Sequence, residues 1–157
     1  MRSIDLLKQQ HRSLEKLVSQ ALEARGPERV RLLGALAEEL TLHAAVEEEH
    51  LYPALQKGGL GQAAERSSRQ DERIRTLVSE ILELKRSDPK LEAKVAELGS
   101  ATREHLASEE GSIFPALEEA FSAEQLEEMG EAMNGLVSRL RGAELLKIAG
   151  EREPARA

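Results

Sequence analysis

The sequence predicts an all-α protein, an up-down-up-down antiparallel four-helix bundle followed by a short fifth C-terminal helix. First, Leu, Ala, Glu, Lys and Arg dominate the 157 residues and β-branched residues are few, as is usual in helical proteins. Second, apolar residues recur at spacings of three and four, the period of a helix face. Third, breakers divide the chain into long segments at "RGPE" (25–28), "KGGLG" (57–61) and "SDPK" (87–90).

Each long segment carries its own apolar stripe, and short connections make neighbouring helices antiparallel. Helices are expected at about 3–25, 28–57, 62–86 and 89–120, with a shorter one at about 123–142. Asp88-Pro89 is a predicted cap and first turn, and "SAEQ" from Ser122 is a predicted capping box. These limits place one domain at 1–142, and leave 143–157 as a helix extension or a disordered tail.

The composition narrows the class of protein. The chain has no cysteine, which excludes disulfides and thiolate metal sites. It has neither an apolar signal segment at its start nor an apolar run long enough to span a bilayer, so we expect a cytoplasmic protein without a membrane partner. The net charge of -7 and the 2% of aromatic residues argue against nucleic acid as a partner.

Polar residues interrupt the apolar stripes of all four long helices. Burying an unpartnered carboxylate costs several kcal/mol, whereas a whole domain is stable by only about 5–15 kcal/mol. Something in the core must therefore neutralise these groups. The interrupting residues are His11, His43, Glu47, His50, Asp71, His105, Glu109 and Ser112.

The polar residues are expected to meet in one layer. His11 and His43 each lie 16 residues from Pro27, the centre of the first connection. Asp71 and His105 each lie 17 residues from the centre of the third connection. Residues equidistant from a hairpin loop lie at the same height on antiparallel helices, so one polar layer should cross the bundle between apolar layers.

The layer belongs to an internal duplication. The stretch "HAAVEEEHLYPAL" from His43 and the stretch "HLASEEGSIFPAL" from His105 share seven of thirteen residues. Upstream, "QHRSLEKLVS" from Gln10 aligns with "QDERIRTLVS" from Gln70. The chain is thus two helix hairpins of one pattern, and each is expected to supply half of a pseudo-two-fold site.

The spacing inside each motif is that of a metal site. His43 and Glu47 are four residues apart and leave one helix face, and His105 and Glu109 repeat this arrangement. Mixed imidazole and carboxylate ligands suit Fe, Mn or Zn better than Mg or Ca. With one group from each remaining helix the set suits two ions bridged by the two glutamates. The candidate ligands are His11, His43, Glu47, Asp71, His105 and Glu109.

The doubled motif, preceded by His11, resembles the hemerythrin-like, or HHE cation-binding, domain family over about residues 4–120. The resemblance implies a four-helix bundle with a non-haem di-iron centre, two Fe ions joined by an oxo or hydroxo bridge. It carries over five ligands, namely His11, His43, Glu47, His105 and Glu109. Asp71 stands where the third helix of the family normally offers a histidine, so a ligand and a supporting residue are both open readings of it.

The resemblance also implies a function, which is binding or responding to O₂ or a related small oxidant, with O₂, NO or redox sensing and iron handling as family roles. Two alternatives stay open. One is an oxidoreductase that acts on peroxide or NO at the same centre. The other is a structural bundle with a vestigial metal site. Any sensor output would have to pass through a protein partner.

Several residues beside the motifs are expected to support the ligands, to pack in the bundle or to face solvent. His50 shares the inner face one turn beyond the motif glutamate, so it is expected to support a ligand or to pack, with a ligand role as the alternative. Glu48 and Glu110 are rotated off the face and are expected to be solvated. Tyr52 and Phe114, each followed by a proline, are expected to close the end of the bundle.

Overall fold

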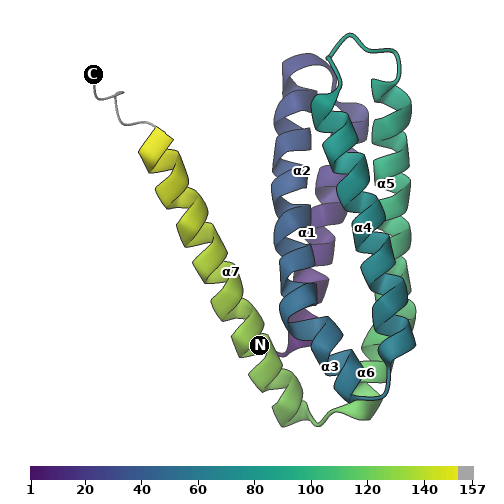
Figure 1. The fold of residues 1–157 in the computed structure, drawn as a ribbon, viewed down its shortest axis with the longest axis vertical. Coiled ribbons are helices and arrows are strands. Elements are labelled where there is room, and N and C mark those ends of the chain that lie inside the picture. Colours follow the sequence, from purple (N-terminus) through teal and green to yellow (C-terminus); the bar gives the residue numbers. More distant parts are fainter. Residues whose placement is uncertain (152–157) are drawn as a thin grey trace.

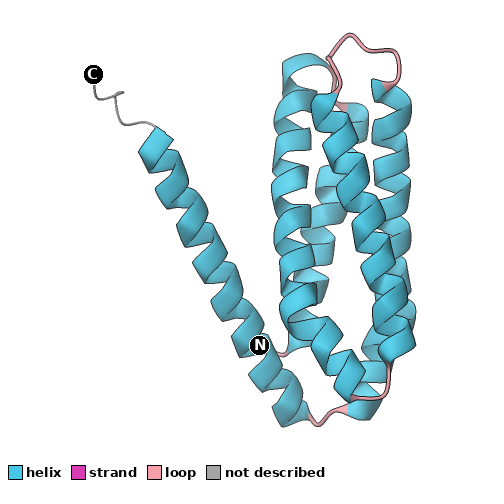
Figure 2. Cartoon of the chain, viewed as in Figure 1, coloured by secondary structure: helices cyan, strands magenta, loops and turns pink. Residues whose placement is uncertain are grey.

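The protein is all-helical in a computed structural model that describes the backbone of residues 1–151 and the side chains of residues 1–143 (Figure 2). No strand occurs in residues 1–151, which confirms the predicted fold class. The helical elements are α1 (Ser3–Glu23), α2 (Gly26–Val46), η1 (Glu47–Leu51), α3 (Tyr52–Lys57), α4 (Gly61–Glu83), α5 (Leu91–Ser108), η2 (Glu109–Ile113), α6 (Phe114–Ala120) and α7 (Ala123–Glu151).

The first eight elements form the four rods of the bundle. The segments α2, η1 and α3 run on without a break as the second rod, and α5, η2 and α6 do the same as the fourth. α1 packs against α2 and α5, and α4 packs against α5, so the rods stand side by side in antiparallel order (Figure 1). The observed helix limits lie close to the predicted ones, and the up-down-up-down arrangement is confirmed.

Two π-helical turns, η1 and η2, interrupt the second and fourth rods at equivalent places. In η1 the backbone N–H of Tyr52 donates to the carbonyl of Glu47, five residues back, and in η2 Phe114 donates to Glu109 in the same way. The next residue in each rod is Pro53 or Pro115, which has no N–H to donate and whose ring disturbs the preceding turn. The wide turn absorbs this disturbance, and each one begins at a motif glutamate.

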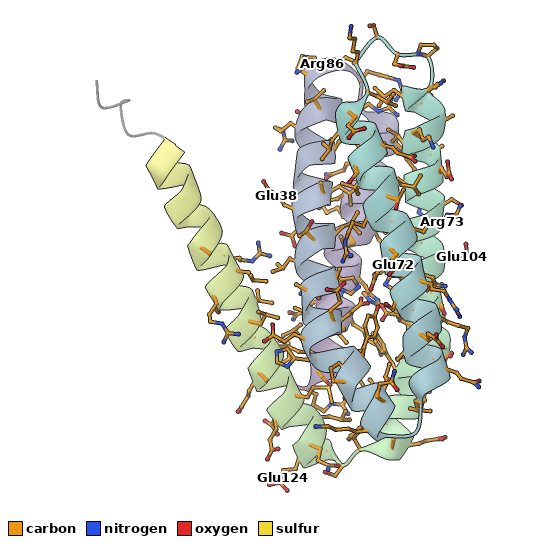
Figure 3. The ribbon with its side chains drawn as sticks, viewed as in Figure 1. Glu38, Glu72, Arg73, Arg86, Glu104 and Glu124 are labelled. Atoms are coloured by element: carbon orange, nitrogen blue, oxygen red, sulfur yellow. The ribbon has the colours of Figure 1, made fainter. Side chains whose placement is uncertain are left out.

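The core consists of two apolar clusters. One contains Ile4, Leu7, Leu55 and Leu117 at the α3 and α6 end of the bundle. The other surrounds Leu36 and its neighbours at the opposite end. The six predicted ligands are buried between the two clusters, as the helix register predicted, while charged residues such as those labelled in Figure 3 point outward. No helix within residues 1–151 has the length and apolar character needed to cross a bilayer.

The fifth helix, α7, is longer than predicted. Its capping box is confirmed, because Gln125 N–H donates to Ser122 Oγ at 3.1 Å and Ser122 N–H donates to Gln125 Oε1 at 2.9 Å. The helix continues beyond residue 142 to Glu151, so residues 143–151 form a helix extension, one of the two alternatives given for this segment. It docks closely on the chain start, where a side chain at Gly130 would overlap the backbone of Met1.

One predicted cap is wrong, and part of the predicted tail lies outside the described residues. Asp88 does not cap the fourth rod, since α5 begins only at Leu91. Its carboxylate instead accepts the backbone N–H of Lys90 at 2.8 Å within the preceding turn. The proposed disordered end of the chain falls on residues 152–157, which the structure does not describe.

Candidate metal centre

The structure brings all six predicted ligands into one buried layer. They come from all four rods of the bundle, and none has more than 5% of its surface exposed. By element, they are His11 on α1, His43 on α2, Glu47 at the start of η1, Asp71 on α4, His105 on α5 and Glu109 at the start of η2.

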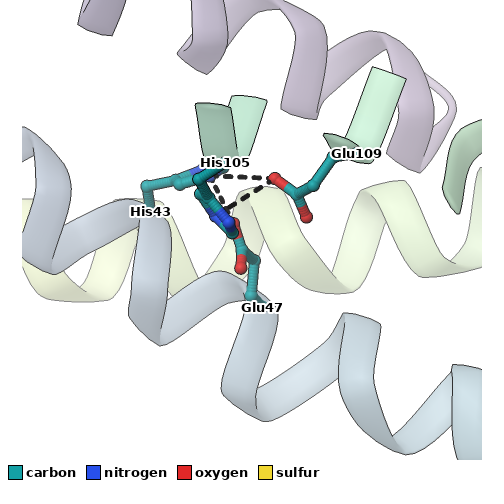
Figure 4. Close-up of side chains that lie close together, drawn as sticks. All are labelled: His43, Glu47, His105 and Glu109. Atoms are coloured by element: carbon teal, nitrogen blue, oxygen red, sulfur yellow. Dashed lines mark hydrogen bonds and ion pairs between the residues drawn. The ribbon is translucent and has the colours of Figure 1, made fainter. Parts of the chain in front are cut away.

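Four of these residues form the compact centre of the layer. One ligand atom from each of His43, Glu47, His105 and Glu109 lies within 4.8 Å of the others (Figure 4). His43 Nε2 contacts Glu47 within its own rod and lies 3.4 Å from Glu109 Oε1. His105 Nε2 lies 3.3 Å from Glu47 and 3.4 Å from Glu109. Each histidine thus faces both glutamates, the arrangement expected if the glutamates bridge two ions.

His11 and Asp71 extend the centre on its two sides. His11 Nε2 lies 3.1 Å from Glu109 Oε1, and Asp71 Oδ1 lies 3.1 Å from His105 Nε2. The residues on α1 and α4 therefore occupy corresponding positions about the pseudo-two-fold axis, with an imidazole on one side and a carboxylate on the other.

The outer nitrogen of each histidine has its own partner. His43 Nδ1 donates to Gln10 Oε1 at 2.9 Å, and His105 Nδ1 donates to Gln70 Oε1 at 2.9 Å. These bonds leave Nε2 of both rings aimed at the centre, since the ring orientation is held from behind. The sequence contains a pattern that indicates this supporting role: the two glutamines are identical in the repeat, and each precedes a layer residue.

Tyr52 takes part in the layer, contrary to its predicted role as a closing residue only. Its oxygen contacts both Glu47 Oε2 and Asp71 Oδ2, with one proton to donate to either carboxylate, and it lies 3.4 Å from the buried Ser67 Oγ. In the equivalent place, Phe114 stacks on His11 with ring centroids 5.3 Å apart. Tyr52 and Phe114 differ only by a hydroxyl group, and this hydroxyl lies on the Asp71 side of the layer.

Two further predictions on flanking residues have different outcomes. Glu110 was expected to be solvated, but its carboxylate accepts a hydrogen bond from His11 Nδ1 at 2.8 Å, although 45% of its side chain is exposed. His50 forms no hydrogen bond to the layer within the described residues, and its nearest charged neighbour is Glu49 at 3.9 Å. The packing reading of His50 therefore fits better than the ligand reading.

The two imidazoles at the centre are strongly basic. Burial lowers the pKa of His43, but the Glu47 charge and the contact with Glu109 outweigh burial and raise the pKa to about 10. Burial also lowers the pKa of His105, and hydrogen bonding to Asp71 and Glu47 outweighs it and raises the pKa to about 11. A metal ion that binds here must displace protons from these rings.

The glutamates are correspondingly acidic. Burial and the Glu109 charge raise the pKa of Glu47, but His43 and His105 outweigh them and bring the pKa to about 2. Burial also raises the pKa of Glu109, and the hydrogen bonds from His11 and His43 bring it to about 2. Both glutamates are therefore anions near neutral pH, as bridging ligands must be.

Asp71 and the Tyr52 phenol behave differently. Burial raises the pKa of Asp71, and the hydrogen bond from His105 only partly offsets this. Burial, followed by the charges of Glu47 and Asp71, raises the pKa of the Tyr52 phenol, which keeps its one proton between the two carboxylates.

The donor set suits a pair of transition-metal ions. Three imidazole nitrogens and three carboxylates converge in a buried layer, and this donor set matches Fe, Mn or Zn rather than Mg or Ca. Glu109 Oε2 is buried and has no hydrogen-bond partner among the described residues, so it is an unused acceptor at the centre. An ion would satisfy it and would neutralise the buried carboxylates.

Comparison with known proteins agrees with this chemistry. A crystal structure of a hemerythrin HHE cation-binding domain-containing protein from Mycobacterium kansasii matches with a TM-score of 0.84 and 26% identity, over 99% of this chain and 95% of that one. A protein from Nostoc sp. strain PCC 7120 named "DNA nickase" is 26% identical over 139 residues. That match covers 87% of this chain but only 39% of the Nostoc protein.

The sequence profile of the hemerythrin HHE cation-binding domain matches residues 2–117, which span the four rods and all six layer residues. The earlier resemblance is confirmed by this match and by the structural likeness, and a metal-binding function follows from both. The chain therefore belongs to the hemerythrin HHE cation-binding domain family.

Proposed function

We propose that the chain is a non-haem di-iron protein that binds or responds to O₂ or a related small oxidant. The observation that supports this most directly is the buried layer of three histidines and three carboxylates from four rods, in which both motif glutamates face both central histidines. The family to which the chain belongs binds cations, and the donor types favour iron over the alkaline-earth ions.

Each residue has a role in this proposal. Glu47 and Glu109 would bridge two ions, with the histidines as terminal nitrogen ligands and Asp71 as the carboxylate of one side. Two iron ions so held would supply reversible electron transfer and a place where a small oxidant can bind. The protein would keep the histidines oriented through Gln10 and Gln70, exclude water through the two apolar clusters, and hold a proton on the Tyr52 hydroxyl.

A second candidate is an oxidoreductase that acts on peroxide or NO at the same centre. The observation that favours it is the Tyr52 hydroxyl, which lies inside the layer and contacts the carboxylates of Glu47 and Asp71. A buried phenol held between two candidate ligands is placed to deliver a proton to a small molecule bound nearby. The nickase name of the Nostoc protein does not favour a third candidate, because this chain covers 39% of that protein and is acidic overall.

One experiment distinguishes these functions. The protein is loaded with ferrous iron without oxygen, its iron is counted, and air, NO and peroxide are then added separately under an optical spectrometer. Two iron ions per chain with near-ultraviolet bands that appear and reverse with O₂ would support binding. Irreversible oxidation, or steady consumption of peroxide or NO, would support redox chemistry. A well-folded protein that takes up no metal would leave the vestigial site as the answer.

A further inference from the structure

A surface groove of about 670 Å³ lies between α2, α4 and α7 and reaches the metal layer. α7 starts beneath the bundle and diverges from α2 as it rises (Figure 1). Asp71 lines this groove, and its carboxylate contacts His105 through Oδ1 and Tyr52 through Oδ2. The remaining walls are mostly apolar and include Ala44, which follows His43 in the sequence, and Ile74, which lies three residues after Asp71. The groove therefore connects the outside of the bundle with the Asp71 side of the layer.

The groove runs along the seam between α2 and α4, the line where these two helices face each other, and the internal repeat provides a comparison for this seam. The pseudo-two-fold axis exchanges α1 with α4 and α2 with α5, so the α2/α4 seam corresponds to the α1/α5 seam. The α1/α5 seam is closed. Gly99 lets α1 come close, since a side-chain carbon there would lie 3.2 Å from Val18 Cγ1 and 3.5 Å from Leu22 Cδ1. Leu106 fills the space beside His105 and is 1% exposed.

The α2/α4 seam has different residues at the equivalent positions and is open. By the repeat offset, Ala37 stands in the place of Gly99 and Ala44 in the place of Leu106, and both alanines line the groove. Leu82 replaces Leu22 but is 63% exposed, because α2 does not come close enough to cover it. Accordingly α2 contacts α4 far less than α1 contacts α5.

The two sides of the layer differ in the same way as the two seams: the His11 side is packed, and the Asp71 side borders the groove. On the closed side, Phe114 stacks on the His11 ring and Glu110 holds its outer nitrogen. On the open side, a carboxylate replaces the imidazole and borders the groove. Asp71, the residue unusual for the family, thus lies at the open one of the two seams that the repeat relates.

We propose that the α2/α4 seam is the entry route by which an uncharged diatomic molecule reaches the Asp71 side of the centre. This inference rests on the proposed function and adds the place of entry and the class of molecule admitted. A small neutral molecule loses little hydration in passing an apolar wall. An anion would lose much more and would then meet the Asp71 carboxylate. The seam should therefore discriminate by charge and, at Ala44, by size.

The test places in the α2/α4 seam the same residue type, leucine, that fills the α1/α5 seam. Ala44→Leu copies Leu106, which the fold already accommodates at the equivalent place. The matched control is Ala107→Leu, the same substitution at an exposed position of the fourth rod. Ala44→Val is a smaller change for use if Ala44→Leu lowers the helical content seen by circular dichroism.

The first readout needs no metal. Tyr52 is the only tyrosine and there is no tryptophan, so tyrosine emission from the full metal-free chain reports on the layer itself. We expect dissolved O₂ to quench this emission in the wild type and in Ala107→Leu, and about threefold less in Ala44→Leu, because a packed seam opens only through side-chain fluctuation. Iodide should quench none of the three. Equal O₂ quenching in all three proteins would overturn the route, as would strong quenching by iodide.

The second readout uses iron-loaded, reduced protein mixed rapidly with O₂. The reaction should slow by about tenfold in Ala44→Leu and remain unchanged in Ala107→Leu, with the iron content equal in all three. Equal slowing in both variants, or in neither, would overturn the route even if iron binds. If the wild type takes up no iron, the proposed function fails, and the quenching measurement still decides whether the seam admits O₂.

Discussion

The side-chain oxygen of Gln10 accepts a hydrogen bond from Nδ1 of His43 at 2.9 Å, and Gln70 holds His105 at the same distance. Each bond runs from the first helix of a repeat to the second, so it joins a hairpin internally and orients a ring toward the partner hairpin. The duplication therefore preserved the support behind the ligands as well as the ligands. A site built in this way depends on two matched halves.

Removing this support should weaken metal binding without unfolding the protein. Gln10→Ala and Gln70→Ala should each lower metal affinity by about 10–100-fold, because the imidazole loses the partner that sets its orientation and tautomer. Competition with a chelator of known affinity measures the effect. Gln9→Ala, an exposed neighbour, is the control and should have no effect. Equal affinities for all four proteins would show that the glutamines only fill space.

The motif glutamates should be needed for two ions but not for the fold. Glu47→Ala or Glu109→Ala should prevent binding of the second ion while leaving the helical content largely intact, because the two apolar clusters carry the fold. Iron counting and circular dichroism check the two parts. Glu48→Ala, which removes an exposed carboxylate paired with Arg75, is the control. If the metal-free variants lose their helical content, the two glutamates are needed for folding as well as for metal binding.

The charge of Asp71 should lower the reduction potential of the iron-loaded centre. Ferric iron gains more from a neighbouring carboxylate than ferrous iron does, so the wild type should rest in the ferric state in air. Asp71→His and Asp71→Asn should each raise the potential by at least about 60 mV, a tenfold shift for a one-electron couple. Spectroelectrochemical titration in one buffer measures all three. An unchanged potential in both variants would place Asp71 outside the ligand set.

The metal-free and metal-loaded proteins should respond to pH in opposite ways. Above pH 6.5 the unfolded chain loses its histidine protons, whereas His43 and His105 keep theirs up to a pKa of about 10 and 11. The folded metal-free state then binds more protons, so its stability should fall as the pH rises from 6.5 through 10. Toward acid, stability should fall from pH 4.5 to about 2 as Glu47 and Glu109 are protonated.

With metal bound, those imidazole protons are already displaced, so stability should rise between pH 6 and 8 as competition from protons decreases. Urea unfolding across this range, with and without iron, checks the sign of both slopes. A parallel pH dependence in the two forms would contradict the assignment of His43 and His105 as ligands. Proton release on metal addition, followed with a pH indicator, provides an independent measurement.

Much of this architecture could be predicted from local pattern. The apolar spacing located the four rods, because a helix with one buried face must repeat its apolar residues every three or four positions. The gaps in that spacing located the polar layer, and the distances of His11 and His43 from their loop brought them to one height. These inferences succeeded because each depends only on helix geometry and the length of short connections.

Other features depend on atoms that meet across the bundle. Tyr52 and Phe114 are interchangeable to a pattern based on apolarity, yet one hydroxyl reaches Glu47 and Asp71 and the other ring stacks on His11. Likewise, Glu110 is rotated away from the inner face of its own helix, but a neighbouring helix brings His11 within 2.8 Å of it. Spacing along one helix carries no information about either contact.

The sequence by itself determined the helices, the doubled motif and the height at which the polar residues lie, because these follow from periodicity within single segments. Only the tertiary structure decided that the two halves are unequal, with the α1/α5 seam closed and the α2/α4 seam open beside Asp71. The physical reason is that the closeness of two helices depends on the summed shapes of side chains from both. The effect of a glycine or an alanine on the distance between two helices depends on the side chains that face it from the other helix.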